Sequence, residues 1–290
     1  MQRPKILVLG SNGMAGKEFV KQFKSEDHEI LSLARRNADI ELDCTQYRHV
    51  VEALDQYQPD IIINCCAIVN MNMCEDNPYS TFKINVGLVE VLSAWCSANK
   101  RKFVHISTDH FYDYGDAQPH TETDPLVTVN NYSRQKLSSE HVALFDSNSL
   151  ILRTSITGIK DLCQPKTFFD WAYAVCKNNE NATLFTDAYT STIDIRSFVQ
   201  YTISLIKLDA YGIYNVASSE VYSKADFTIE LARQLGRSTE KFNYGQVSNL
   251  KVKRANCLGL SVEKLGSVLP NALPDLNKVV NNLLNMVGEI

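Results

Sequence analysis

The hydrophobic positions in the first half of the chain alternate between short continuous runs and longer stretches with helical spacing. Continuous apolar runs predict strands at residues 5–9, 29–33, 60–64, 102–107 and 149–153. Apolar residues three or four apart predict helices at about 14–25, 45–56, 76–98 and 130–146. Strands that are apolar throughout are buried on both faces, and their alternation with helices is typical of a parallel sheet. We therefore predict an α/β fold with a doubly wound parallel sheet.

The second half of the chain is less regular. Its pattern predicts short strands near 183–185, 212–216 and 242–244, between helices near 166–178, 194–207, 223–236 and 275–287. We expect segments near 183–220 to return to the sheet and the remainder to form a smaller, mainly C-terminal lobe. No Gly/Ser-rich linker divides the chain. We expect a division near residue 155, into parts 1–155 and 156–290, that no linker marks.

Composition and charge exclude several classes of protein. The chain has 290 residues, of which 44% are hydrophobic and 21% charged, and this is ordinary for a globular protein. A net charge of −4 argues against a nucleic-acid partner, since such binders usually carry a basic excess. No apolar stretch approaches the length of a membrane span, and the N-terminal M-Q-R-P-K enters a strand at once, which leaves no room for a signal peptide. We predict a cytoplasmic protein with no membrane partner.

The cysteines do not form a recognisable framework. They lack C-x-x-C spacing and stand at positions 44, 65, 66, 74, 96, 163, 176 and 257. Several lie inside apolar runs, which favours buried free thiols in a reducing compartment over disulfides or zinc ligands. We predict no metal site, because metal-ligand spacing is missing.

A glycine-rich turn follows the first predicted strand. The segment G-S-N-G-M-A-G at 10–16 places Gly10, Gly13 and Gly16 between the apolar run and the first helix. In dinucleotide-binding Rossmann folds, such glycines make the tight turn, let the backbone approach a pyrophosphate and allow close helix–strand packing. The helix N-terminus then offers free N–H groups and a positive dipole end to the phosphates. A turn without a ligand is the alternative, since the spacing differs from the commoner G-x-G-x-x-G.

A tyrosine and a lysine four residues apart indicate carbonyl chemistry. Tyr132 and Lys136 lie on one face of a predicted helix, about two dozen residues after Thr108 closes a strand. An ammonium beside a phenol lowers the phenol pKa, which is normally about 10. Such a phenol can give a proton to a carbonyl oxygen that the Thr108 hydroxyl also hydrogen-bonds. The spacing also occurs by chance on exposed helices, and hydroxyls at a strand end also bond to backbone.

The residues after the second strand bear on the choice between NADH and NADPH. An acidic residue there accepts hydrogen bonds from a free ribose hydroxyl, whereas arginine can bind a 2′-phosphate. Here Arg35 and Arg36 follow the strand, and no carboxylate occurs before Asp39. We predict a preference for NADPH with NADH tolerated, and solvated arginines are the alternative.

Several motifs together resemble one family. They include L-D-x-T at 42–45, I-N-C-C-A at 63–67, Asn85-Val86, S-T-D-H-F-Y-D-Y-G at 107–115, E-T-D-P at 122–125, Y-x-x-x-K-L-x-x-E at 132–140, L-R-T-S at 152–155 and, more loosely, G-I-Y-N at 212–215 and R-A-N at 254–256. As a set they resemble the extended short-chain dehydrogenase/reductase superfamily, and within it the dTDP-4-dehydrorhamnose reductases. The resemblance implies a dinucleotide-binding part at 1–155 and a mainly substrate-binding lobe at 156–290.

The resemblance also implies roles for individual residues. Tyr132 would be the general acid, Lys136 would tune its pKa and bind the nicotinamide ribose, and Thr108 would polarise the carbonyl. The remaining implied cofactor contacts are Gly10, Asn12, Gly13, Met14 and Gly16 at the pyrophosphate, Asp43 and Cys44 beside the adenine, and Cys66 and Ala67 toward the nicotinamide. The implied substrate contacts are Asn72, His110, Tyr189 and Arg254.

The activity that follows is NADPH-dependent reduction of the 4-keto group of a nucleotide-diphosphate 6-deoxy sugar. Asn72 and His110 depart from the residues usual in the family, so the resemblance does not predict which sugar is reduced. One alternative is a nucleotide-sugar dehydratase or epimerase, although His110 stands where dehydratases usually have Glu. Another is a non-catalytic regulatory protein of the same fold, similar to the regulatory subunit of methionine adenosyltransferase. A homodimer is possible.

Overall fold

The computed structural model describes residues 3–26, 28–114, 117–145, 148–160, 162–163, 167–246, 255, 257–269 and 272–289. Predicted positions 115, 254 and 256 therefore lie outside the described residues. The chain forms two compact units. The first unit consists of Met1–Thr108, Thr128–Arg153 and Thr202–Tyr214, and the second of Asp109–Val127, Thr154–Tyr201 and Asn215–Ile290.

The first unit is built on a seven-stranded sheet in the order β11-β6-β5-β4-β1-β2-β3. The strands are β1 (Lys5–Leu9), β2 (Glu29–Ala34), β3 (Ile40–Glu41), β4 (Ile61–Asn64), β5 (Lys102–Ile106), β6 (Ser149–Arg153) and β11 (Gly212–Asn215). Strands β1 to β6 pair in parallel, with Leu7 opposite Leu31 on one side and Ile62 on the other. The predicted α/β fold with a doubly wound, mainly parallel sheet is confirmed.

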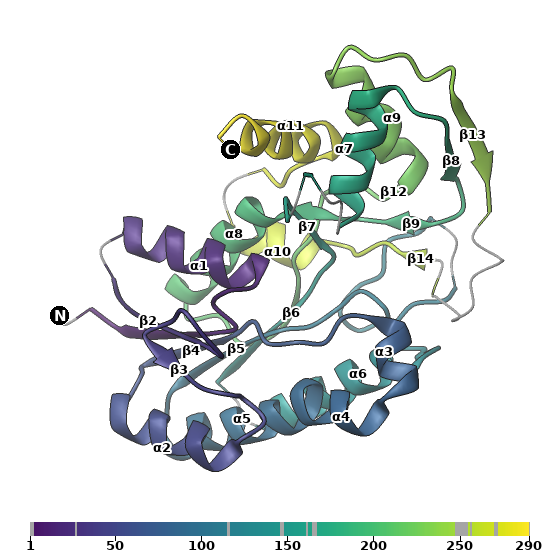
Figure 1. The fold of residues 1–290 in the computed structure, drawn as a ribbon. Helices are drawn as coiled ribbons and strands as arrows, with labels where there is room; N and C mark the ends of the chain where they lie inside the picture. Colours follow the sequence, from purple (N-terminus) through teal and green to yellow (C-terminus); the bar gives the residue numbers. More distant parts are fainter. Residues whose placement is uncertain are drawn as a thin grey trace. The chain divides into compact units, whose positions relative to one another are not determined.

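Helices cover both faces of this sheet (Figure 1). Helix α1 (Met14–Ser25) lies on one face, and α2 (Tyr47–Tyr57), α5 (Leu88–Asn99) and α6 (Asn131–Ala143) lie on the other. Strand residues and the inward faces of α2 and α5 share one apolar core, which includes Leu9, Leu54 and Leu92. Burial of such side chains from water is the main stabilising term for the unit.

The predicted helix at 76–98 is several elements rather than one. The structure has α3 (Met71–Asp76), α4 (Pro78–Phe82), a π-helical turn (Lys83–Gly87) and then α5. The interruption falls at Asn77, whose φ of −135° and ψ of 58° are not helical. Proline disfavours the α conformation of the residue before it, so Pro78 explains the break. Asn70 caps α3, because its side chain accepts a hydrogen bond from the Met73 N–H at 3.0 Å.

The second unit contains short sheets and helices around its own core. The strand pairs are β7 (Ile156–Thr157) with β10 (Ile193–Asp194), and β8 (Ala182–Phe185) with β13 (Phe242–Gly245). A third sheet has the order β12 (Tyr222–Ser223), β9 (Tyr189–Thr190), β14 (Cys257–Leu258). The helices of this unit are α7 (Phe168–Asn178), α9 (Lys224–Gln234), α10 (Glu263–Val268) and α11 (Leu276–Val287), together with the part of α8 (Ile195–Lys207) up to Tyr201.

Two of the strands predicted in the second half of the chain belong to different sheets. The strand predicted near 212–216 is β11 at the edge of the seven-stranded sheet. The strand predicted near 183–185 is β8, which pairs with β13 instead of returning to that sheet. Thr167 and Ser223 form capping boxes that start α7 and α9, so local hydrogen bonds explain why these helices lie close to their predicted positions.

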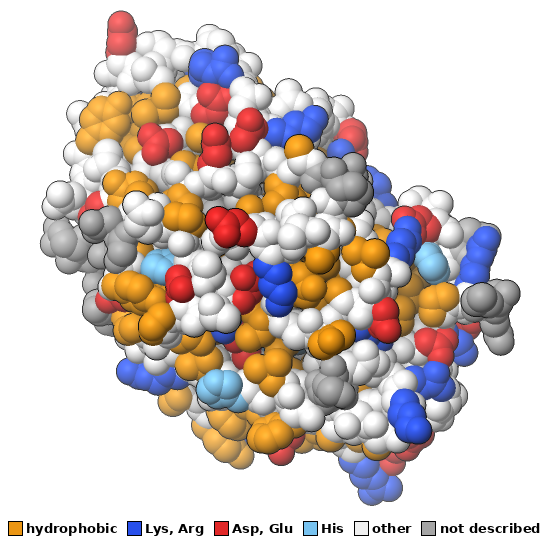
Figure 2. All heavy atoms as spheres, turned by 180° about the vertical axis from the view of Figure 1, so that it is seen from behind, with side chains coloured by type: hydrophobic (Ala, Val, Ile, Leu, Met, Phe, Trp, Pro, Cys, Tyr) orange, Lys and Arg blue, Asp and Glu red, His pale blue; other side chains and the backbone are white. Residues whose placement is uncertain are grey.

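No helix in the described part of the chain is long and apolar enough to cross a membrane. On the face shown in Figure 2, lysine and arginine side chains are interspersed with aspartate and glutamate side chains.

Candidate active site

Several motifs of the first unit meet where its parallel strands end. Gly10 follows β1, Cys65 follows β4 and Ser107 follows β5, and these strands are neighbours in the sheet. The Cys65 N–H donates to the Leu9 carbonyl at 3.0 Å, and the Ser107 N–H donates to the Leu152 carbonyl at 2.7 Å. In open sheets of this class, ligands bind beyond the carboxyl ends of the strands. This edge is therefore the candidate site.

Two positions of the glycine turn, Gly10 and Gly16, have no room for a side chain. Gly10 has a φ of +73°, which L-residues rarely adopt, and a Cβ there would lie 3.0 Å from the Cys65 carbonyl carbon. A Cβ on Gly16 would lie 2.3 Å from the Gly10 oxygen. Gly16 thus lets α1 pack directly on the turn, and Gly10 lets the turn touch the chain after β4.

The turn suits an anionic group such as a pyrophosphate. The N-cap of α1 is Gly13, which provides no side-chain hydrogen bond, and the first helical turn carries no acidic residue. The first N–H groups of a helix lack intrahelical partners and favour negative charge. The Ser11 hydroxyl is buried in the turn, and its oxygen has no hydrogen-bond partner among the described residues. Sequence reasoning missed Ser11, whose only signal was a hydroxyl inside the glycine motif.

The two arginines after β2 lie beside the glycine turn. Both side chains are exposed, and the Asn12 side-chain amide donates to the Arg36 carbonyl. Asp39 is the nearest following carboxylate, and one of its oxygens already accepts hydrogen bonds from Ser32, at 2.9 Å from the N–H and 2.7 Å from the hydroxyl. Arg35 and Arg36 are therefore exposed to a ligand, whereas the Asp39 carboxylate is hydrogen-bonded to Ser32.

The residues expected beside the adenine follow β3, and those expected toward the nicotinamide follow β4. Asp43 is exposed, and its Oδ1 accepts from the Thr45 N–H and hydroxyl, each at 2.9 Å. These hydrogen bonds, with a smaller contribution from Arg35, lower the pKa of Asp43. The Cys44 and Cys66 sulfur atoms lie 3.8 Å apart, and Ala67 is exposed. The two loops thus form one surface next to the glycine turn.

Helix α6 begins where Asn130 forms a capping box. The Asn130 side chain accepts from the Ser133 N–H at 2.8 Å, and the Ser133 hydroxyl oxygen accepts from the Asn130 N–H at 3.3 Å. This cap places Tyr132 in the first turn and Lys136 one turn later on the same face, and both side chains are buried.

Lys136 reaches the end of β5, the strand that leads to Thr108. Its Nζ donates to the Ile106 carbonyl at 2.7 Å and lies 3.2 Å from His105 Nε2. Burial lowers the pKa of Lys136 to about 8, although Glu140 opposes this effect. Burial, with a smaller contribution from the Lys136 charge, lowers the pKa of His105 well below its usual value. A neutral imidazole can accept a hydrogen bond from the ammonium, whereas a protonated one would repel it.

His105 lies inside β5 and was not among the predicted site residues. The alternation of side chains along a strand was the signal for it, because it places His105 on the face of the sheet that α6 covers. Its Nε2 also lies 3.0 Å from the Ser139 hydroxyl, one turn after Lys136 on α6.

A buried ion pair connects α6 to the ends of β5 and β6. Glu140 and Arg153 are 1% and 2% exposed, and Arg153 Nη2 donates to Glu140 Oε2 at 2.8 Å. The Ser107 hydroxyl donates to the other Glu140 oxygen. The Ser107 hydroxyl proton is therefore used in the hydrogen bond to the Glu140 carboxylate. Thr108, the next residue, is buried directly after β5.

Two polar side chains fix the helix that carries Tyr132. Gln135 is buried, accepts from the Asn85 amide at 2.8 Å and donates to the Thr81 hydroxyl at 2.9 Å. Glu75 of α3 accepts from the Asn131 N–H at 2.6 Å. Asn85 lies in the π-helical turn, a feature frequent at functional sites. Sequence reasoning assigned no role to Gln135 or Glu75.

The residues predicted to contact the substrate are spread over both units. Asn72 lies exposed on α3 in the first unit. His110 and Tyr189 belong to the second unit, where His110 Nε2 lies 3.8 Å from Asp109 Oδ1 and Tyr189 begins β9. Arg254 lies outside the described residues.

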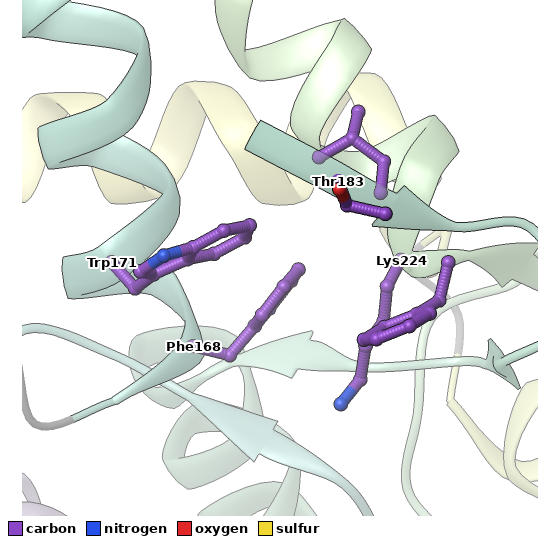
Figure 3. Close-up of a pocket in the computed structure, with 6 residues that line it drawn as sticks. Phe168, Trp171, Thr183 and Lys224 are labelled. Atoms are coloured by element: carbon purple, nitrogen blue, oxygen red, sulfur yellow. The ribbon is translucent and has the colours of Figure 1, made fainter. Parts of the chain in front are cut away.

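The second unit has a cavity of about 180 Å³ that sequence reasoning did not anticipate. It is lined by Phe168, Trp171, Thr183, Leu184, Phe185 and Lys224. Figure 3 shows Phe168 and Trp171 of α7 beside each other, with Thr183 and Lys224 on the other side. The two rings lie 5.8 Å apart, and Lys224 Nζ lies 5.1 Å from the Phe168 ring centre. Aromatic faces suit the stacking of a flat ligand.

The eight cysteines all lie in the described part of the chain, and none of them forms a disulfide. Among the described residues, no three histidine, cysteine, aspartate or glutamate side chains are grouped as metal ligands would be.

Comparison with known proteins agrees with this architecture. The chain is an oxidoreductase of the extended short-chain dehydrogenase/reductase class. Within that class it belongs to the family described as RmlD substrate binding domain, whose model matches residues 4–286.

Individual relatives cover nearly the whole chain. The probable low-salt glycan biosynthesis reductase Agl14 of Haloferax volcanii is 28% identical over 285 residues, which are 93% of this chain and 95% of that protein. The dTDP-4-dehydrorhamnose reductase of Escherichia coli K12 is 24% identical over 97% of each chain. The crystal structure of the dTDP-4-dehydrorhamnose reductase of Bacillus anthracis in complex with NADP has a TM-score of 0.88 and is 18% identical in sequence. The match covers 98% of this chain and 100% of that one, and it shows that the two proteins share a fold.

Proposed function

We propose that this protein uses NADPH to reduce the 4-keto group of a nucleotide-diphosphate 6-deoxy sugar. The observation that carries the proposal is the placement of Tyr132 and Lys136 on the helix that packs on the end of β5, at the sheet edge that also holds the glycine turn. The family and the names of its reductases support this substrate class.

Each catalytic side chain has a separate task. The dihydronicotinamide, when bound, supplies the hydride. Tyr132 gives its phenolic proton to the oxygen of the former ketone, and the Thr108 hydroxyl hydrogen-bonds that oxygen while negative charge develops on it. Lys136 stabilises the phenolate that remains, because its ammonium lies on the same helix face. Ile106 and His105 hold the ammonium in place through the contacts at its Nζ.

The other parts of the cofactor and substrate would be held by the neighbouring loops. Gly10, Gly13 and Gly16, with Asn12, Met14 and the Ser11 hydroxyl, would hold the pyrophosphate. Cys44, Cys66 and their neighbours Asp43 and Ala67 would flank the adenine and the path to the nicotinamide. In the second unit, the aromatic cavity with Lys224 suits the base of the nucleotide, since bases stack on aromatic rings.

The decisive experiment measures NADPH oxidation against a panel of nucleotide-linked 4-keto-6-deoxy sugars. We expect stoichiometric NADPH consumption with at least one of them. Tightly bound oxidised cofactor that survives purification, without net NADPH consumption, would instead indicate a dehydratase or epimerase. No turnover on any sugar, with co-purification of a second enzyme, would indicate a regulatory protein.

The exposed arginines after β2 are expected to select NADPH. In the double variant Arg35→Ala, Arg36→Ala, the KM for NADPH should rise by about tenfold or more, because a charge-assisted contact to the 2′-phosphate is worth at least about 1.4 kcal/mol. The KM for NADH should change by less than about twofold. Steady-state kinetics with both cofactors checks this, and equal effects on both would show that the arginines are only solvated loop charges.

The low pKa of Lys136 predicts an alkaline limit to activity. Below about pH 8 the amine is protonated and can stabilise the phenolate, and above it this charge is lost. We expect kcat/KM for reduction to fall by about tenfold per pH unit on the alkaline side. Arginine keeps its charge, so the limb should move to higher pH in Lys136→Arg. An unchanged limb in that variant would assign the titration to another group.

A further inference from the structure

Two thiols in the candidate cofactor site are in direct contact. Cys44 follows β3 and Cys66 follows β4, and their sulfur atoms lie 3.8 Å apart although the residues are 22 positions apart in the sequence. Cys44 is 7% exposed and Cys66 is half-buried. The neighbouring Cys65 lies on the same loop as Cys66. The fold thus pairs two thiols that the sequence places on separate loops.

The surroundings of the pair favour reaction at Cys44. A hydrogen bond from the Cys66 thiol lowers the pKa of Cys44, against the opposing effects of burial and of the Asp43 charge, and Arg35 makes a smaller contribution in the lowering direction. The same shared hydrogen bond raises the pKa of Cys66. The thiolate is the reactive form of cysteine, and a sulfenic acid formed next to a second thiol can be resolved to a disulfide.

We propose that Cys44 and Cys66 are a redox-sensitive modification site, which a peroxide converts to a reversible disulfide that weakens dinucleotide binding. The Cys44 thiolate attacks one oxygen of hydrogen peroxide, the O–O bond breaks, and a sulfenic acid and a hydroxide form; the hydroxide takes up a proton to become water. The Cys66 sulfur then attacks the sulfenic sulfur, the S–O bond breaks, and the oxygen leaves as water with the thiol proton. Two thiols and one peroxide thus give one disulfide and two waters.

Forming this bond must disturb the neighbouring turn. The sulfur atoms have to approach by about 1.8 Å to reach the S–S length of about 2.0 Å. The chain at Cys65 and Cys66 already touches the glycine turn, since a Cβ on Gly10 would lie 3.1 Å from the Cys66 nitrogen. Movement of this loop therefore changes the surface offered to the pyrophosphate and adenine. This consequence rests on the proposed function, whereas the disulfide itself does not.

Mass spectrometry and NADPH fluorescence test the two parts separately. After treatment of the whole chain with hydrogen peroxide, we expect a loss of about 2 Da and a peptide cross-link between Cys44 and Cys66. The Kd for NADPH should rise by about tenfold or more and return to its starting value after reduction with dithiothreitol. In Cys44→Ser, which lacks the attacking thiolate, the cross-link should be missing, and peroxide should not change the Kd of that variant. The matched variant Cys65→Ser should still form the cross-link.

Two outcomes would overturn the proposal. One is a disulfide that contains Cys65 or Cys74, or none at all, under these conditions. The other is an oxidised protein that binds NADPH as tightly as the reduced one. Failure of the reduced protein to bind NADPH would contradict the proposed function, and the mass change would still decide whether the pair oxidises.

Discussion

Replacing Tyr132 by phenylalanine is expected to lower kcat by about 10²–10⁴-fold, the usual contribution of a general acid. The ring remains to fill its buried position on α6, so the fold and the Kd for NADPH should be preserved. The change removes a proton transfer that is made only in the transition state, and kcat and kcat/KM should therefore fall together. Steady-state kinetics and NADPH fluorescence titration measure the two quantities.

Tyr201→Phe is the matched control. Its hydroxyl donates to the Ala272 carbonyl at 3.2 Å in the second unit and has no proposed part in the chemistry. Its kcat should stay within about twofold of the unmodified protein. Near-normal turnover in Tyr132→Phe would end the general-acid assignment, and equal losses in both variants would point to a loss of folded protein.

The substitution Glu140→Ala is expected to lower the free energy of unfolding by about 3–5 kcal/mol. It leaves the Arg153 guanidinium, only 2% exposed, without its carboxylate partner. It also removes the acceptor of the Ser107 hydroxyl at the end of β5. Breaking one side of a buried pair is costly because the other charge remains out of water. Urea denaturation of the purified protein measures the change.

An exposed ion pair in the same unit provides the control. Glu52 pairs with Arg48 on the surface of α2, with side chains 55% and 89% exposed. Glu52→Ala should change the free energy of unfolding by less than about 1 kcal/mol. Replacing both buried partners, in Glu140→Leu with Arg153→Met, should recover most of the loss. A cost in Glu140→Ala no larger than that in Glu52→Ala would show that Arg153 finds another partner or water.

The sequence by itself determined the elements whose signals are local. The first strand at 5–9 and the first helix at 14–25 have the predicted bounds, because apolar runs and helical spacing act over a few neighbouring residues. The placement of Tyr132 and Lys136 on one helix face follows from the helical repeat alone. The glycine turn could also be predicted from the sequence, because glycine is the residue that adopts a positive φ such as that of Gly10 without strain.

Only the tertiary structure decided which distant residues meet. The contact of Lys136 with His105, the pairing of Glu140 with Arg153 and the 3.8 Å approach of Cys44 to Cys66 join segments that are far apart in the sequence or lie on different elements. Likewise, β8 pairs with β13 rather than with the main sheet, because strand partners are chosen by packing across the whole unit. Local periodicity specifies which face of an element is apolar, whereas the partner of that face depends on the folding of the entire chain.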